Sequence, residues 1–185
     1  MNLANRLTVL RILLVPVFIA LLLYFSPERA FLHLWAVGVY LLACLTDAVD
    51  GYLARRLGQT TTLGSYIDPI ADKLLLLSGY CSLSLMPNIP AAMHVPAWVT
   101  LAVISRDVVI LVGAVTVFIA TGSLKPQPLW VSKVTTVVQM TALLFSLLAL
   151  PWSVRLSLYA LTVCLTLVSG IAYIRLGARL FQEKI

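Results

Sequence analysis

The chain has 185 residues, of which 61% are hydrophobic and 11% are charged. Soluble domains carry about 25% charged residues, so this composition excludes an ordinary soluble protein and indicates an integral membrane protein. The formal net charge of +6 does not indicate a nucleic-acid partner, because the basic residues lie in loops beside apolar runs, where anionic lipid attracts them. The length predicts a single domain, residues 1–185, with room for about six spans of ~20 residues in the lipid bilayer.

Six apolar runs follow one another along the chain. They cover residues 8–24, 31–49, 67–85, 97–120, 129–150 and 154–176. The breaks between them contain Pro, Gly and Asn, which favour turns. The sequence therefore predicts an all-α, polytopic membrane protein with six transmembrane helices.

The basic residues predict the orientation of these spans. With the N-terminus inside, the outer side receives Arg29 and Arg155. The inner side receives ten basic residues: Arg6, Arg11, Arg55, Arg56, Lys73, Lys125, Lys133, Arg175, Arg179 and Lys184. Cytoplasmic loops carry an excess of Lys and Arg. We therefore expect a protein of the bacterial inner membrane, with the inner ends of its second and third spans facing the cytoplasm.

Four of the seven acidic residues lie at the inner ends of those two spans. Asp47 and Asp50 end the second span, and Asp68 and Asp72 begin the third. Residues three or four apart share one face of a helix. Two antiparallel helices joined by a connection over residues 51–66 would bring the four carboxylates together. Ionisable groups so close to hydrocarbon are costly, and they indicate a functional site.

Four carboxylates in one pocket repel one another, and divalent cations with hard oxygen ligands resolve that repulsion. A set without His or Cys favours Mg²⁺ or Mn²⁺ over Zn²⁺. Gly51 and Gly64 would let the backbone approach a phosphate, and Arg55 can neutralise one. A metal site that holds phosphates at a membrane surface indicates transfer chemistry on a lipid-linked diphosphate.

The complete pattern is Asp-x2-Asp-Gly-x2-Ala-Arg-x8-Gly-x3-Asp-x3-Asp, from Asp47 to Asp72. It resembles the defining motif of the CDP-alcohol phosphatidyltransferases at every fixed position and gap. The resemblance extends over nearly the whole chain, including the six-span layout. The first span is similar to that family's pattern at Asn5, Thr8, Arg11 and Pro16.

This resemblance implies an enzyme that uses CDP-diacylglycerol as donor and a hydroxyl group as acceptor, and that releases CMP. It also implies a two-metal site for Mg²⁺ or Mn²⁺ and a homodimer. The metal ligands would be Asp47, Asp50 and Asp68, with Asp72 completing the site and acting as general base. The cytidine diphosphate part would be held by Gly51, Arg55 and Gly64, with help from Asn5 and Thr8.

The fourth and fifth spans bear on the acceptor. Phosphatidylglycerophosphate synthases usually show Arg-Glu followed by Gly-Leu-Arg, and then Gly-Lys-x-Lys-Thr-x-x-Gln. This chain has Asp107 for the Glu, lacks the Gly-Leu-Arg, and has Thr135 where the second Lys would be. Residues 104–107 and 125–139 look more like the eukaryotic-type cardiolipin synthases of the same family. We therefore expect phosphatidylglycerol as acceptor, with glycerol 3-phosphate as the alternative.

Arg106 and Lys133 are the expected acceptor-binding residues. Absence of the second Lys suits the single charge of a phosphodiester better than a dianionic phosphomonoester. Arg106 and Asp107 are adjacent, so on a helix their side chains point about 100° apart and need not pair. A structural salt bridge between these two residues is the alternative for Arg106, and a topological role is the alternative for Lys133.

Three rival readings explain the aspartates less well. A cation transporter would place acids near mid-membrane on broken helices, whereas these lie at the inner mouth beside Gly and Arg. An aspartate-rich prenyltransferase would repeat its cluster far along the chain, and no second cluster follows Asp72. A structural ion-pair network fails because four acids outnumber the one or two bases nearby.

Overall fold

The computed structural model describes the backbone of residues 3–57, 62–121 and 130–182. It describes side chains within 8–49, 71–119 and 130–177, apart from residues 48, 72, 114, 117 and 118. These parts of the chain contain six α-helices and a short 3-10 helix and no strand, which confirms the all-α prediction. The α-helices are α1 (Leu3–Leu23), α2 (Phe31–Leu57), α3 (Thr62–Leu85), α4 (Ala97–Thr121), α5 (Trp130–Leu147) and α6 (Trp152–Gln182). The 3-10 helix η1 (Pro27–Arg29) lies between α1 and α2.

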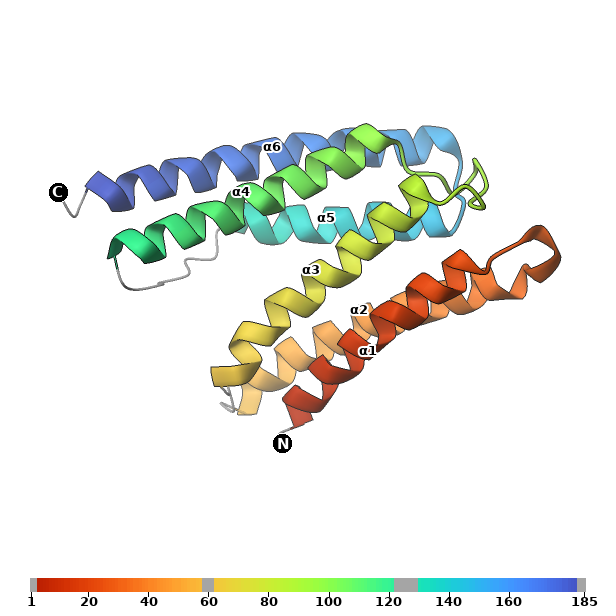
Figure 1. Ribbon diagram of the computed structural model, residues 1–185, viewed down its shortest axis with the longest axis horizontal. Coiled ribbons are helices and arrows are strands. Elements are labelled where there is room, and N and C mark those ends of the chain that lie inside the picture. The colour runs from red at the N-terminus through yellow and green to blue at the C-terminus, as the bar shows by residue number, and fades with distance from the viewer. Residues whose placement is uncertain (1–2, 58–61, 122–129, 183–185) are drawn as a thin grey trace. The chain divides into compact units, whose positions relative to one another are not determined.

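The chain divides into two compact units. Unit 1 comprises Met1–His94 with Ser146–Ala149, and unit 2 comprises Val95–Phe145 with Leu150–Ile185. Within unit 1, α1 lies against both α2 and α3, and within unit 2, α4 lies along α6 (Figure 1). Figure 1 also shows that the N-terminal ends of α1 and α3 and the C-terminal end of α2 lie at one end of unit 1.

One face of α1 forms much of the core of unit 1. Its buried residues recur every three or four positions, which is the spacing of a single helix face: Thr8, Arg11, Val15, Phe18 and Leu22. Phe18 packs against Tyr40 of α2, with ring centroids 5.8 Å apart. This buried face is apolar at the C-terminal end of α1 and polar at its N-terminal end. The polar end lies where the aspartate-bearing ends of α2 and α3 also lie.

The helices extend further than the apolar runs indicate. α2 continues to Leu57 and α3 begins at Thr62, so the expected connection over residues 51–66 was wrong. Apolarity marks the part of a helix that fits hydrocarbon, whereas backbone hydrogen bonding continues until a residue or a turn interrupts it. Gly51 and Gly64 consequently lie inside helices, as do the other fixed positions of the motif.

Two helices in the described residues are long and apolar enough to cross a membrane, Trp130–Leu147 and Trp152–Gly177. Shorter apolar helical stretches cover Thr8–Leu23, Phe31–Asp47 and Lys73–Leu85. All six helices keep large apolar side chains exposed, as a lipid-facing surface does, including Leu13, Trp35, Leu85, Ile119, Val137 and Leu167. Six spans therefore stay a prediction, whereas the apolar helical character of the protein is observed.

Hydroxyl groups on the exposed helix surfaces are satisfied within their own helix. Thr116 donates to the carbonyl of Val112 at 2.8 Å, and Thr141 donates to the carbonyl of Val137 at 2.8 Å. Both bonds run one turn back along the helix, where the carbonyl also accepts the ordinary backbone bond. The exposed surfaces of α4 and α5 therefore present these hydroxyls already bonded.

The loop after α3 closes the C-terminal end of α1. Asn88 Nδ2 donates hydrogen bonds to the carbonyls of Leu22 and Phe25 at 2.7 and 3.0 Å. The last carbonyls of a helix have no partner within the helix, so a side-chain donor here stabilises the helix end. Asn88 thus fixes the loop of α3 against α1 at the apolar end of unit 1.

Replacement of Asn88 should destabilise unit 1. We expect Asn88→Ala to lower the free energy of unfolding by about 1–3 kcal/mol, because the carbonyls of Leu22, Leu23 and Phe25 lose this donor. Thermal unfolding of the purified protein in detergent would measure this loss. Asn88→Asp is a second test, because it keeps the shape of the side chain and removes its donor. It should be at least as unstable as Asn88→Ala. Wild-type stability in Asn88→Asp would contradict the capping role.

Candidate active site

Two consecutive helices carry the four motif aspartates. Asp47 and Asp50 lie in the C-terminal half of α2, and Asp68 and Asp72 lie in the first half of α3. Five peptide units link the end of α2 to the start of α3, so these helix ends lie within roughly 19 Å of each other. The backbone thus brings the two carriers of the motif to one end of unit 1. That the four carboxylates share one pocket stays a prediction.

Most side chains of the predicted site lie outside those that the structure describes. This holds for three aspartates, Asp50, Asp68 and Asp72, and for the predicted donor-binding residues Asn5, Gly51, Arg55 and Gly64. Asp47 and Thr8 are described. Among the described side chains no group of three or more His, Cys, Asp or Glu could hold a metal ion. The motif as a donor set offers carboxylate oxygens alone, which is the chemistry that Mg²⁺ and Mn²⁺ prefer.

Asp47 forms an ion pair with Arg11 of α1. The distance between Arg11 Nη1 and Asp47 Oδ1 is 3.1 Å, and the side chain of Arg11 is fully buried while that of Asp47 is 36% exposed. Thr8 is buried one turn before Arg11 on the same face of α1. The polar end of α1 therefore lies against the first residue of the motif, which places a predicted donor-binding residue close to Asp47.

This ion pair was missed by sequence reasoning. Arg11 was predicted as part of the first-span pattern and as a basic residue of the inner side, without a partner. The signal that could have found it is the spacing of the buried face of α1. Arg11 occupies a position in that face between Thr8 and Val15, and a cation at such a position requires an anion on the helix packed against it.

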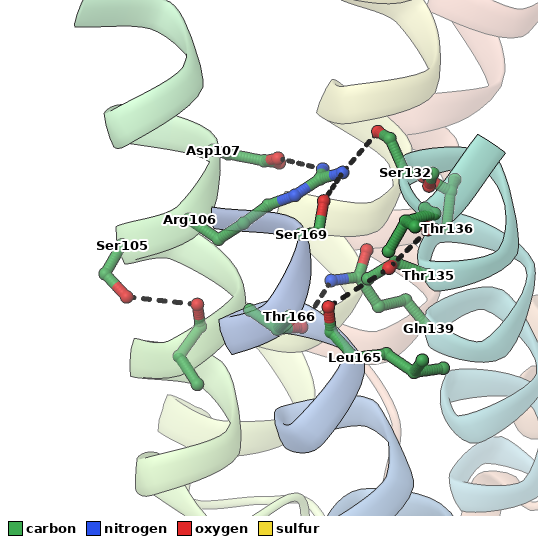
Figure 2. A network of polar contacts seen from close by, with 12 residues as sticks. Ser105, Arg106, Asp107, Ser132, Thr135, Thr136, Gln139, Leu165, Thr166 and Ser169 are labelled. Carbon is green, nitrogen blue, oxygen red and sulfur yellow. Dashed lines mark hydrogen bonds and ion pairs between the residues drawn. The ribbon is translucent and has the colours of Figure 1, made fainter. Parts of the chain in front are cut away.

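A second polar cluster surrounds Arg106 of α4 in unit 2. Figure 2 shows its guanidinium directed between α5 and α6. Nη1 donates to Asp107 Oδ1 at 2.8 Å, and Nη2 donates to the hydroxyls of Ser132 and, at 3.2 Å, Ser169. Arg106 is 6% exposed, and its Nε is buried without a hydrogen-bond partner among the described residues. Arg106 and Asp107 thus do pair, although their adjacency did not require it.

Thr135 occupies the position where phosphatidylglycerophosphate synthases carry their second Lys. Its hydroxyl donates to the carbonyls of Val131 and Leu165 at 2.7 and 3.3 Å, and the residue is fully buried. One turn further along α5, Gln139 Nε2 donates to Thr166 Oγ1 of α6 at 3.2 Å (Figure 2). At this position α5 and α6 are therefore joined by hydrogen bonds between neutral groups, whereas phosphatidylglycerophosphate synthases carry a lysine there.

Lys133 lies in the first turn of α5, next to Ser132 in sequence. Its Nζ lies 5.2 Å from the ring centroid of Trp130, and the residue is exposed. Because Ser132 contacts Arg106, the start of α5 brings Lys133 and Arg106 into one region of unit 2. Arg106 is buried and bonded to three side chains, whereas Lys133 is exposed and contacts the ring of Trp130.

Residues 1–170 match the sequence profile of the family described as CDP-alcohol phosphatidyltransferase. A relative from Mycobacterium tuberculosis, a probable phosphatidylglycerophosphate synthase, is 35% identical over 183 residues, 96% of this chain and 82% of its own length. A CDP-diacylglycerol–glycerol-3-phosphate 3-phosphatidyltransferase from Blochmanniella floridana is 34% identical over 196 residues, 100% of this chain and 95% of its own. The human cardiolipin synthase (CMP-forming) is 33% identical over 201 residues, 96% of this chain and 62% of its own.

The apolar helices and the carboxylate motif define a membrane-associated transferase of phospholipid biosynthesis. The match over residues 1–170 and the three relatives fix its family. The chain belongs to the CDP-alcohol phosphatidyltransferases and is an enzyme of that activity. The family resemblance drawn from the motif is therefore confirmed.

Proposed function

We propose that the enzyme transfers the phosphatidyl group of CDP-diacylglycerol to the hydroxyl of a glycerol-type acceptor at the motif on α2 and α3. The observation that carries this proposal is the complete Asp47–Asp72 motif in a chain of this family. The acceptor oxygen forms a bond to the phosphatidyl phosphorus, and the phosphoanhydride bond to CMP breaks. CMP leaves with the electron pair of that bond, and the proton of the acceptor hydroxyl passes to Asp72.

In this proposal the chain's own groups bind and orient the reactants. Asp47, Asp50, Asp68 and Asp72 would hold Mg²⁺ or Mn²⁺ in a two-metal site, and the bound cations would supply positive charge for the departing phosphate. A second set of residues holds the cytidine diphosphate part: Asn5, Thr8, Gly51, Arg55 and Gly64. Thr8 supports this assignment, because it lies on the same buried face of α1 as the arginine that contacts Asp47.

The proposed acceptor is phosphatidylglycerol, which would make the enzyme a cardiolipin synthase. Arg106 and Lys133 would hold its phosphate. Thr135 supports this choice, because its position is neutral, buried and bonded to two carbonyls. Two cations, one of them already paired with Asp107, suit the single charge of a phosphodiester better than a phosphomonoester dianion.

Glycerol 3-phosphate is the second candidate acceptor. The names of the bacterial relatives favour it, since the relatives from M. tuberculosis and B. floridana are both named for phosphatidylglycerophosphate or glycerol 3-phosphate. Their identities of 35% and 34% lie too close to the 33% of the human cardiolipin synthase to separate the two acceptors. In this proposal residues 104–107 and 125–139 bear on the acceptor more than overall identity does.

We further propose six membrane spans in a single domain, a homodimer, and a location in a bacterial inner membrane with the motif facing the cytoplasm. The excess of basic residues on one side supports this orientation. The exposed apolar side chains on all six helices support the spans.

One assay tests the reaction and its acceptor together. Purified protein would receive labelled CDP-diacylglycerol and Mg²⁺ with phosphatidylglycerol, glycerol 3-phosphate or both, and the lipid products would be separated. We expect cardiolipin as the main product of the mixture, and no product in excess chelator. Phosphatidylglycerophosphate as the sole product would refute the proposed acceptor and keep the proposed reaction. Full activity in chelator would refute the metal site.

Replacement of the proposed general base should slow turnover. We expect Asp72→Asn to lower kcat by about 10²–10⁴-fold, because proton transfer from the acceptor hydroxyl loses its base. Donor binding, measured by titration with CDP-diacylglycerol, should be largely retained. Asp107→Asn is the matched control, since it removes a carboxylate that pairs with Arg106, and it should keep most of kcat. Wild-type turnover in Asp72→Asn across pH would contradict the assignment.

Replacement of Arg106 should weaken acceptor binding selectively. Loss of a charge-assisted hydrogen bond costs about 1.5–3 kcal/mol, so we expect Arg106→Ala to raise the acceptor KM roughly 10–150-fold. The KM for CDP-diacylglycerol should stay nearly unchanged. Arg155→Ala is the matched control, because Arg155 is equally buried and donates to the carbonyl of Leu150. A rise in donor KM with normal acceptor kinetics would contradict the proposed acceptor site.

A further inference from the structure

Arg11 lies on the buried face of α1 between Thr8 and Val15. The buried face of α1 continues through Val15, Phe18 and Leu22, and Arg11 is the position one turn before Val15. Its side chain is fully buried. A permanent cation buried among apolar helices is costly, and a hydrophobic residue of similar volume is often as stable or more stable there. Packing therefore does not account for Arg11.

The ion pair with Asp47 does not explain the presence of an arginine at position 11 by its contribution to folding stability either. Asp47 is 36% exposed, so water already solvates its carboxylate. A pair in which one partner is partly exposed contributes little to the free energy of unfolding. The contact is nevertheless specific, because a buried guanidinium reaches one oxygen of the first aspartate of the motif at 3.1 Å.

We propose that Arg11 is a positioning residue that holds Asp47 through Oδ1 and thereby reserves Oδ2 for the divalent cation of the active site. The inference rests on the proposed function, in which Asp47 is a metal ligand. Carboxylates that bind metals are themselves hydrogen-bonded by neighbouring groups, which fix the side-chain rotamer and direct the free oxygen. With Oδ1 held by Arg11, Oδ2 of Asp47 would be the oxygen directed toward the cation.

Removal of Arg11 has two opposite effects on cation binding. Loss of a nearby positive charge by itself would strengthen the binding of a divalent cation. Loss of the fixed rotamer would weaken it, and removal of such orienting partners typically weakens metal binding about 10–100-fold. The direction of the change therefore separates a positioning role from a purely electrostatic one.

The test measures Mn²⁺ binding to the full-length protein in detergent without substrate, by electron paramagnetic resonance or calorimetry. We expect Arg11→Met to bind Mn²⁺ about 10–100-fold more weakly than the wild type. Its melting temperature without metal should be equal or higher, because an apolar residue replaces a buried cation. Arg11→Lys, which keeps a donor, should recover part of the affinity.

Two controls keep the inference separate from the proposed function. Arg155→Met removes another buried arginine, one that bonds a carbonyl, and should bind Mn²⁺ as the wild type does. Asp50→Asn removes a proposed ligand and should lose binding. Unchanged or tighter Mn²⁺ binding in Arg11→Met, with binding lost in Asp50→Asn, would overturn the positioning role alone. Absence of Mn²⁺ binding in the wild type would overturn both the metal site and this inference.

A structural role for Arg11 predicts a different result. In that case Arg11→Met would lower the melting temperature and leave the Mn²⁺ affinity of the folded protein unchanged. That pattern would also overturn the inference, because a positioning residue changes the affinity and spares the fold.

Discussion

A charged side chain among apolar helices must have a partner, and two arginine–aspartate pairs meet this requirement here. In unit 1, Arg11 of α1 reaches Asp47 of α2. In unit 2, Arg106 and Asp107 pair within α4, and the guanidinium also binds hydroxyls of α5 and α6. In unit 2 the hydroxyls bound by Arg106 link α4 to α5 and α6, whereas in unit 1 the pair links α1 to the first aspartate of the motif.

The helices of unit 1 and those of unit 2 are held together by different interactions. The core of unit 1 contains many rings and aliphatic chains, such as Phe18, Leu22 and Tyr40. Unit 2 joins its helices through Arg106, Gln139 and hydroxyls. In a bilayer apolar contact gives no advantage over lipid, so interhelical hydrogen bonds make the association of helices specific. Polar side chains thus join the helices of unit 2.

The helices and the motif could be predicted from the sequence, because both are local. Apolar runs marked the six helices, and the spacing from Asp47 to Asp72 indicated the family. The predicted ends of α2 and α3 were wrong, because both helices continue past their apolar runs. Hydropathy does not report backbone hydrogen bonding. The partner of Arg11 also escaped prediction, because a pair between residues 36 positions apart depends on how two helices pack. Ser169 escaped for the same reason.

The hydroxyls of unit 2 differ in how they are satisfied, and this bears on the assembly of the protein in the membrane. Thr116 and Thr141 bond to carbonyls of their own helices, so these two hydroxyls need no partner from another helix. Gln139 and Arg106 bond to Thr166 and Ser169 of α6, which follows α4 and α5 in the chain. These polar groups depend on a neighbouring helix, so removal of α6 would leave them without these partners. The packing of α4 and α5 in unit 2 therefore depends on α6.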